Sequence, residues 1–398
     1  MAMGKHDQSG IYCGIEYEYL LCRREAPWPP LEYHQLDFAA LSHLLENKPG
    51  RCDPSLATGD LGVKSGYWYL EGDERFDEAG NFVTMAVKGV EIRTPPKPGV
   101  ESAIAALLVI EKELSSVLAR DGMALGIAGF HPLTPHYDFA PPLNRWEQAQ
   151  RLQHRGYDAA HVSTLSYGPD INLSFAGWSQ EQVLAATRRL IGWSPYIVPF
   201  SFSSPYFQGK PWRGPSIRTY QRSNLRPAAK CFWNAAESEC QVPCYPARIA
   251  SEQGRIEFKA FDAIASVALL EACCYLLIGL CLAEEHALGG DRADGELLAQ
   301  AAQSGFADPR IHAGAAMALR LAEQALVRYG YPPSVLAPLR VLLDSHQTPA
   351  DLLLGHYRQG KPPFLVGGLA LHPQLLPVSS STTLAEIAAW ESLYGAVC

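Results

Sequence analysis

The chain has 398 residues, of which 47% are hydrophobic and 19% are charged, and its formal net charge is −8. This length allows one large domain or two ordinary ones with a sizeable core. The acidic balance and the lack of a basic block argue against a nucleic-acid backbone as partner and favour a soluble enzyme that acts on small molecules.

The first third of the sequence predicts strands followed by a long helix. A strand is expected over Tyr12–Cys22 and a helix over Phe38–Asn47. Residues 66–96 are rich in aromatic and β-branched residues and are broken by DEAGN, which predicts two or three antiparallel strands. An amphipathic helix over Val100–Arg120 closes this part.

The middle of the chain predicts shorter elements in mixed order. In sequence these are a strand ending in a loop at 122–132, a helix over Asn144–Asp158, a strand over Asp170–Phe175, a helix over Ser179–Gly192, a loop over Ser194–Asn224 and a strand over Arg255–Ala263. Antiparallel strands with helices on one side predict an α+β fold.

The apolar stretch Ala263–Ala283 is about as long as a membrane span but carries Glu271 in its middle, so a buried helix is expected. Residues after about Glu284 predict further helices. Nothing marks a domain boundary, so we expect a single domain over 1–398, with the motifs in 11–285 and a helical part in 286–398.

Ten cysteines are scattered along the chain, several of them in apolar runs, which is typical of a reduced, intracellular protein. Cys231, Cys240 and Cys244 form the one cluster that suggests zinc, but the spacing lacks a paired CxxC and favours free thiols. The first 14 residues lack the apolar segment of a signal peptide, so the cytoplasm is the expected location.

Two glutamates, Glu16 and Glu18, lie one residue apart in the first strand, within GIEYEY. Alternate residues of a strand share a face, so both carboxylates point the same way and Tyr17 and Tyr19 point the other way. Two neighbouring carboxylates repel, and their burial is costly without partners.

Further glutamates occur between apolar or aromatic neighbours in expected strands: Glu71, Glu91 and Glu257. One interpretation is a set of solvated strand faces. The other is a single acidic sheet face that binds divalent cations, because carboxylates are hard oxygen ligands suited to Mg²⁺ or Mn²⁺. Mg²⁺ held by a few carboxylates usually also binds substrate phosphates, which indicates ATP chemistry.

The sequence contains no GxxxxGK[ST], no GxGxxG after a strand and no HExxH. A nucleotide would therefore be held mainly through metal and basic side chains. The Gly- and Pro-rich stretch Ser204–Asn224 offers Lys210, Arg213, Arg218 and Arg222, and guanidinium groups bind phosphate or carboxylate oxygens in pairs. The alternative is an ordinary surface loop with solvated charges.

Six motifs occur in order along about residues 11–285: GIEYEY, VEIRTPP, GFHP, INLSF, SPYFQGKPWRGPSIRTYQRS and RIEFKAFD. Their order resembles the glutamate–cysteine ligase family, and more closely its second group of plant-type and bacterial carboxylate–amine ligases. The resemblance implies a glutamine-synthetase-like fold: a curved antiparallel sheet with metals on its concave face and helices outside.

The family's reaction is ATP-dependent. The carboxylate of an acid attacks the γ-phosphate to give an acyl phosphate, and an amine then displaces phosphate to form an amide. The resemblance implies small-molecule substrates and leaves the oligomeric state open.

Carried over residue by residue, the resemblance implies metal ligands at Glu16, Glu18, Glu71, Glu91, Asn172 and Glu257, with Glu71 the looser match. It implies catalytic roles for Arg218 and Lys259. Lys210, Arg213 and Arg222 are expected to contact the nucleotide because of the basic composition of their loop. Arg218 corresponds to an arginine that neutralises the transferring phosphate.

One position departs from the family pattern. Lys259 stands where the family usually has arginine, which keeps the charge but loses the planar fork. His131 matches a family histidine, and a role in fixing the loop is a competing interpretation.

Three functions therefore stay open: a glutamate–cysteine ligase or close relative, the same chemistry on another acid and amine in a specialised pathway, and a non-catalytic ligand-binding relative.

Overall fold

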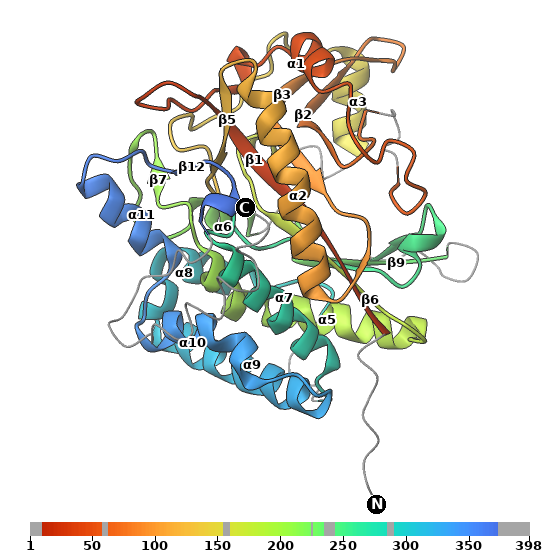
Figure 1. The fold of residues 1–398 in the computed structure, drawn as a ribbon, viewed down its shortest axis with the longest axis vertical. Helices are drawn as coiled ribbons and strands as arrows, with labels where there is room; N and C mark the ends of the chain where they lie inside the picture. Colours follow the sequence, from red (N-terminus) through yellow and green to blue (C-terminus); the bar gives the residue numbers. More distant parts are fainter. Residues whose placement is uncertain are drawn as a thin grey trace, which may run out of the picture.

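The computed structural model describes residues 10–57, 63–153, 160–223, 226–234, 243–284 and 290–372. Its centre is a curled sheet with strands in the order β10-β9-β11-β6-β1-β3-β2 (Figure 1). The strands are β1 Ile11–Arg23, β2 Trp68–Phe76, β3 Phe82–Arg93, β6 Pro169–Phe175, β9 Ala229–Trp233, β10 Cys244–Pro246 and β11 Ile256–Phe258. Neighbours are antiparallel except β9 and β10, which are parallel.

Strand β1 organises the sheet because it pairs with several strands along its length. It pairs with β6 and β3 on its two sides, with β4 (Lys97–Pro98) near its start and with β5 (Met123–Ile127) near its end. Strand β12 (Leu365–Val366) adds to β5 and so brings the end of the described chain to the same sheet.

The alternation expected in the first strand is confirmed. Tyr17 and Tyr19 are fully buried on one face of β1, where the Tyr17 hydroxyl donates to the Ile264 carbonyl oxygen over 2.6 Å. The Tyr19 hydroxyl donates to the carboxylate of Glu111, whose side chain also accepts the backbone N–H groups of residues 369 and 370. Glu16 and Glu18 lie on the opposite face and keep partial exposure.

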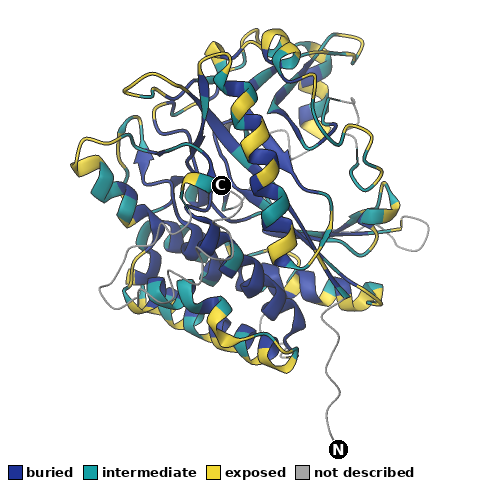
Figure 2. Cartoon of the chain, viewed as in Figure 1, coloured by how far each residue is buried: buried dark blue, intermediate teal, exposed yellow. Residues whose placement is uncertain are grey.

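Helix α2 (Val100–Ala119) covers the tyrosine face of the sheet, and α7 (Val267–Leu282) packs against α2 (Figure 1). All but one of the α7 side chains are buried, as expected of a helix that is apolar all round. Helices α5 (Gln180–Ile197) and α9 (Pro309–Arg328) pack on α7, so it forms the buried centre of the helical layer in Figure 2. Within the described residues, no helix combines the length and apolarity needed to cross a bilayer.

The remaining helices are shorter. They are α1 Phe38–Leu44, α3 Arg145–Gln153, α4 Ala160–Ser163, α6 Ile217–Arg222, α8 Gly295–Ser304, α10 Ala337–Asp344 and α11 Pro349–Arg358. The helical character expected for the last third is confirmed over 290–372, and the end of the expected helix at 154–158 lies outside the described residues.

The prediction of a continuous loop over Ser194–Asn224 is wrong in part. Helix α5 continues to Ile197, and a short hairpin follows, made of β7 (Tyr206–Phe207) and β8 (Lys210–Pro211). Helix α6 begins after Ser216, whose hydroxyl accepts the Thr219 N–H and caps the helix. Short capped elements of this kind depend on local hydrogen bonds that hydrophobic periodicity does not reveal.

The eight cysteines within the described residues are free thiols. Cys231 and Cys244 are register partners across β9 and β10, and both are buried. Cys240, the third member of the cluster considered for zinc, lies outside the described residues, so that hypothesis stays untested.

Candidate active site

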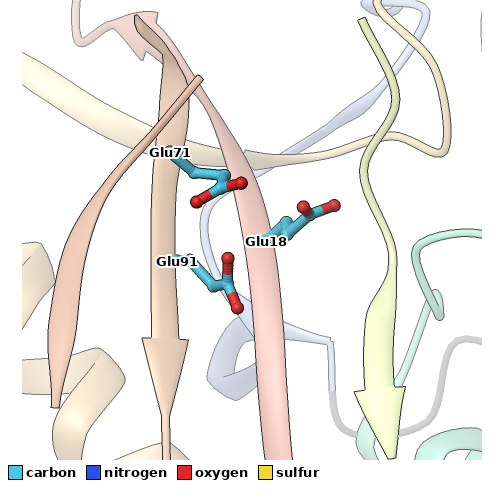
Figure 3. Close-up of side chains that lie close together, drawn as sticks. All are labelled: Glu18, Glu71 and Glu91. Carbon is cyan, nitrogen blue, oxygen red and sulfur yellow. The ribbon is translucent and has the colours of Figure 1, made fainter. Parts of the chain in front are cut away.

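Three of the expected metal ligands meet on the sheet face opposite α2 and the two buried tyrosines. Glu18 on β1 and Glu91 on β3 are direct register partners, and Glu71 lies on the next strand, β2. One carboxylate oxygen of each lies within 4.8 Å of the corresponding oxygens of the other two. Figure 3 shows the three side chains projecting from neighbouring strands, with their carboxylates close together. We call Glu18, Glu71 and Glu91 the carboxylate trio.

The trio is electrostatically crowded. Glu91 is 5% exposed, and burial together with the neighbouring Glu71, Glu16 and Glu18 raises its pKa well above the ordinary value. Burial also raises the pKa of Glu71, but the nearby cations Lys64, Lys88 and Arg226 together outweigh it and leave the pKa below its ordinary value. The trio therefore combines two carboxylates that contact lysines with a third, Glu91, whose pKa is raised by burial and by its neighbouring carboxylates.

Lys88 reaches Glu18 because of a β-bulge. The register of β2 and β3 passes from Glu71 opposite Gly89 to Gly72 opposite Val87, so Lys88 is the extra residue. The bulge interrupts the alternation of β3 and directs the Lys88 ammonium to Glu18 Oε1, 2.6 Å away. The same ammonium donates to the carbonyl oxygens of Ser163 at 3.0 Å and Ser166 at 2.9 Å.

Two other contacts complete the surroundings of the trio. The Lys64 Nζ lies 2.7 Å from Glu71 Oε2. The second oxygen of Glu18 accepts the Gly168 N–H over 3.0 Å. Neither Lys64 nor Lys88 follows from the sequence, because the first depends on the path of a loop and the second on a register shift.

The other three expected ligands form a separate network on β1, β6 and β11. Asn172 lies opposite Glu257 in the register of β6 and β11, and its Nδ2 donates to Glu16 Oε1 over 3.3 Å. Arg255 donates to the Asn172 side-chain oxygen over 2.9 Å and lies 3.6 Å from Glu16. The structure thus divides the six expected ligands into the trio and this second group.

Glu257 is the centre of the second group. Its Oε1 lies 2.7 Å from the Lys259 ammonium and 3.0 Å from that of Lys230, and its other oxygen lies 3.5 Å from Arg255. Lys259 also donates to Asp170 over 2.6 Å. Burial raises the pKa of Glu257, but these three cations outweigh it and hold the pKa below its ordinary value.

The trio is the part of this acidic face that fits a divalent cation. Its donors are all carboxylate oxygens, the type that Mg²⁺ and Mn²⁺ prefer, and they converge from three strands. The trio has three carboxylates and two contacting lysines, so the acidic groups outnumber the cations there. Glu257, by contrast, already contacts three cations. A cation held by Glu18, Glu71 and Glu91 would offset the mutual repulsion that adds to burial in raising the pKa of Glu91.

The expected basic residues fall into two sets. Arg218 and Arg222 lie on α6 and are buried; Arg218 donates to the carbonyl oxygens of Ala260 at 3.1 Å and Lys259 at 3.4 Å. Burial and the nearby Arg218 and Arg226 lower the pKa of Arg222 to about 9. Lys210 on β8 and Arg213 after it are exposed, and Arg213 donates to the Tyr220 hydroxyl.

Asp262 connects two of the sequence motifs and was not singled out from the sequence. It is fully buried and accepts the Ser203 N–H at 3.1 Å and the hydroxyls of Ser204 at 2.6 Å and Ser216 at 3.0 Å. Arg218 Nη1 lies 3.8 Å from Asp262 Oδ1, the oxygen that accepts the Ser216 hydroxyl. Asp262 therefore fixes the start of α6, and with it Arg218, against the segment that follows β11.

His131 is buried, and its Nδ1 accepts the Thr134 N–H over 3.0 Å. Burial lowers its pKa to about 4. This geometry agrees with the interpretation of His131 as a residue that fixes its loop.

Comparisons with known proteins place these features in a family. The model of glutamate-cysteine ligase family 2 matches residues 13–226, the segment that carries the trio, Asn172 and α6. A search of curated proteins returned no match. Glu257 and Lys259 lie beyond the matched segment.

Two solved structures share the fold. One is a bifunctional glutathione synthetase from Pasteurella multocida, with 12% identity and a TM-score of 0.57 over 97% of this chain and 53% of that chain. The other is a glutamate–cysteine ligase from Francisella tularensis in complex with AMP, with 12% identity and a TM-score of 0.50 over 98% of this chain and 93% of that chain.

The chain spans about half the length of the Pasteurella protein. The shared architecture confirms the expected α+β, glutamine-synthetase-like fold class. Because the family match covers more than half of the 398 residues, the protein belongs to glutamate–cysteine ligase family 2.

Proposed function

We propose that the protein is an ATP-dependent carboxylate–amine ligase. The observation that carries the proposal is the family match over residues 13–226 together with the convergence of the trio on strands inside that segment. In this reaction an acid carboxylate oxygen bonds to the γ-phosphorus of ATP and ADP leaves. The amine nitrogen then bonds to the acyl carbon, phosphate leaves with the former carboxylate oxygen, and the amine gives up a proton.

The side chains of the acidic face divide these tasks in our proposal. Glu18, Glu71 and Glu91 hold Mg²⁺ or Mn²⁺, which when bound neutralises phosphate charge. The adjoining part of the face consists of Glu16, Asn172 and Glu257, which keep Arg255 and Lys259 in place. Of the six ligands proposed from the sequence, three therefore hold the metal and three position cationic side chains.

The basic residues contribute positive charge at the edge of this face. Arg218, fixed beside Lys259 and Asp262, stabilises the charge of the transferring phosphoryl group, and Lys259 contacts the acid or the phosphate. Lys210, Arg213 and Arg222 are the proposed nucleotide contacts. The exposure of Lys210 and Arg213 leaves their ammonium and guanidinium groups accessible to a nucleotide.

The substrate pair that the family favours is glutamate and cysteine, which gives a γ-glutamyl amide. A second candidate is the same chemistry on another acid and amine. Lys259 favours the second candidate, because it replaces the planar fork of arginine with a point charge already paired to Asp170 and Glu257.

An ADP-release screen over amino acids and amines with Mg²⁺ tests the proposal. We expect ADP and phosphate to be released only when an acid and an amine are both present. Release of AMP and pyrophosphate would contradict the acyl-phosphate route. Metal binding without turnover of any pair would favour a non-catalytic relative.

A further inference from the structure

The two lysines that contact the trio are held in different ways. Lys88 donates to Glu18 and to the carbonyl oxygens of Ser163 and Ser166, and its side chain is 4% exposed. Lys64 lies 2.7 Å from Glu71, and its side chain is 30% exposed. Lys88 cannot leave without also removing the donor from two carbonyl oxygens, whereas the Lys64 ammonium would give up its contact with Glu71 and could be solvated in its place.

The backbone at Lys64 is anchored independently of its side chain. Its carbonyl oxygen accepts a hydrogen bond from Arg93 Nη2 over 3.0 Å, and Arg93 Nε donates to the Gly66 carbonyl oxygen over 2.9 Å. The side chain can therefore move away from Glu71 by rotation about its own bonds while the backbone around it stays in place.

We propose that Lys64 is an internal counter-cation that competes with the divalent cation for Glu71 and thereby sets the metal affinity of the trio. The inference rests on the proposed function in that it takes the trio as the metal site. An ammonium and a divalent cation on one carboxylate repel each other, so metal binding must overcome either the Lys64–Glu71 ion pair or this repulsion. Lys88 stays in place and orients Glu18.

The test is Mn²⁺ binding to the full chain without nucleotide, measured by calorimetry or by the loss of the free-ion paramagnetic resonance signal. Lys64→Met removes the competing charge and is expected to bind Mn²⁺ about tenfold more tightly than the wild type. Lys64→Arg keeps the charge and should bind within about twofold of the wild type. Lys112→Met is the control for net charge, because Lys112 is exposed on α2, on the other side of the sheet.

A double-mutant cycle with Glu71 separates competition from a general electrostatic effect. In a Glu71→Gln background, the partner of Lys64 carries no charge, so Lys64→Met should increase Mn²⁺ affinity much less than it does in the wild type. Lys64→Gln provides a second neutral variant if the methionine side chain disturbs the loop. Circular dichroism of each metal-free variant checks that it is folded.

Unchanged or weaker Mn²⁺ binding in both neutral variants would overturn the inference, and so would an equal gain in Lys112→Met. An equal gain from Lys64→Met in the Glu71→Gln background would also overturn it. If the wild type and every variant fail to bind Mn²⁺, the trio is no metal site and the proposed function fails with the inference. Metal binding without the gain in the Lys64 variants leaves the proposed function standing and rejects only the role of Lys64.

Discussion

Replacement of Lys88 by methionine should destabilise the metal-free protein strongly. The change removes the donor to Glu18 and to the carbonyl oxygens of Ser163 and Ser166, which lie 2.6, 3.0 and 2.9 Å from the ammonium. Methionine has a similar length, so little packing volume is lost and the effect reports mainly on charge and hydrogen bonding.

The magnitude follows from the burial of the partners. Loss of one member of a buried ion pair costs about 3–5 kcal/mol, because the other charge is left uncompensated. Glu18 is 20% exposed and keeps its bond from Gly168, so water and that N–H offset part of the cost. We therefore expect the free energy of unfolding to fall by about 3 kcal/mol.

Urea unfolding at pH 7 without divalent metal measures this difference. Lys112→Met, an exposed lysine, should change the free energy of unfolding by less than about 0.5 kcal/mol. Adding Glu18→Gln to Lys88→Met removes the uncompensated carboxylate and should restore part of the lost stability. A loss below about 1 kcal/mol for Lys88→Met would refute the view that this lysine is a fixed counter-charge of the trio.

Three further predictions follow from the structure. Burial raises the pKa of Glu147, but Arg75 and two backbone amides outweigh it and lower the pKa to about 2. This depressed pKa stabilises the fold by about 3 kcal/mol above pH 5, and the stabilisation is lost as the pH falls toward 2. The stability gap between wild type and Glu147→Gln in urea unfolding should therefore narrow from pH 7 to pH 3, and a constant gap would contradict this origin. Gly89→Ala places a methyl group 2.0 Å from the Tyr19 carbonyl oxygen, so it should lower the free energy of unfolding by about 2 kcal/mol or more. The control Gly355→Ala meets open space and should be neutral or stabilising. Equal melting temperatures for the two variants would contradict the close approach of β1 and β3. Arg218→Lys keeps a charge without the fork, so steady-state kinetics at saturating metal should show a lower kcat with a smaller change in the KM for ATP, and wild-type parameters would remove Arg218 from the proposed chemistry.

The local features of the site could be predicted from the sequence. The alternation in GIEYEY placed Glu16 and Glu18 on one face and the two tyrosines on the other, because strand geometry alone decides it. The apolar helix after β11 was predicted to be buried because it is hydrophobic all round.

The grouping of the ligands could not be predicted, because it depends on the strand order. β3 and β6 flank β1 on opposite sides, so Glu91 joins Glu18 while Asn172 and Glu257 lie toward Glu16. No local pattern in the sequence contains this information.

The counter-charges were missed for a related reason. Lys88 faces the trio only because of the bulge opposite Glu71 and Gly72, and Lys64 reaches Glu71 from a loop seven residues earlier in the chain. Strand β9, which presents Lys230 to Glu257, has only five residues, which is too short for its pattern to predict a strand. Long-range pairing therefore decides which cations meet the carboxylates.

The central claim is that the acid is activated as an acyl phosphate, and isotope transfer tests it most directly. The acid substrate is labelled with ¹⁸O in its carboxylate, and the phosphate released during amide formation is analysed by mass spectrometry. We expect one ¹⁸O atom per turnover to appear in inorganic phosphate, because the attacking oxygen leaves with the phosphoryl group. Unlabelled phosphate, or label in AMP, would contradict it.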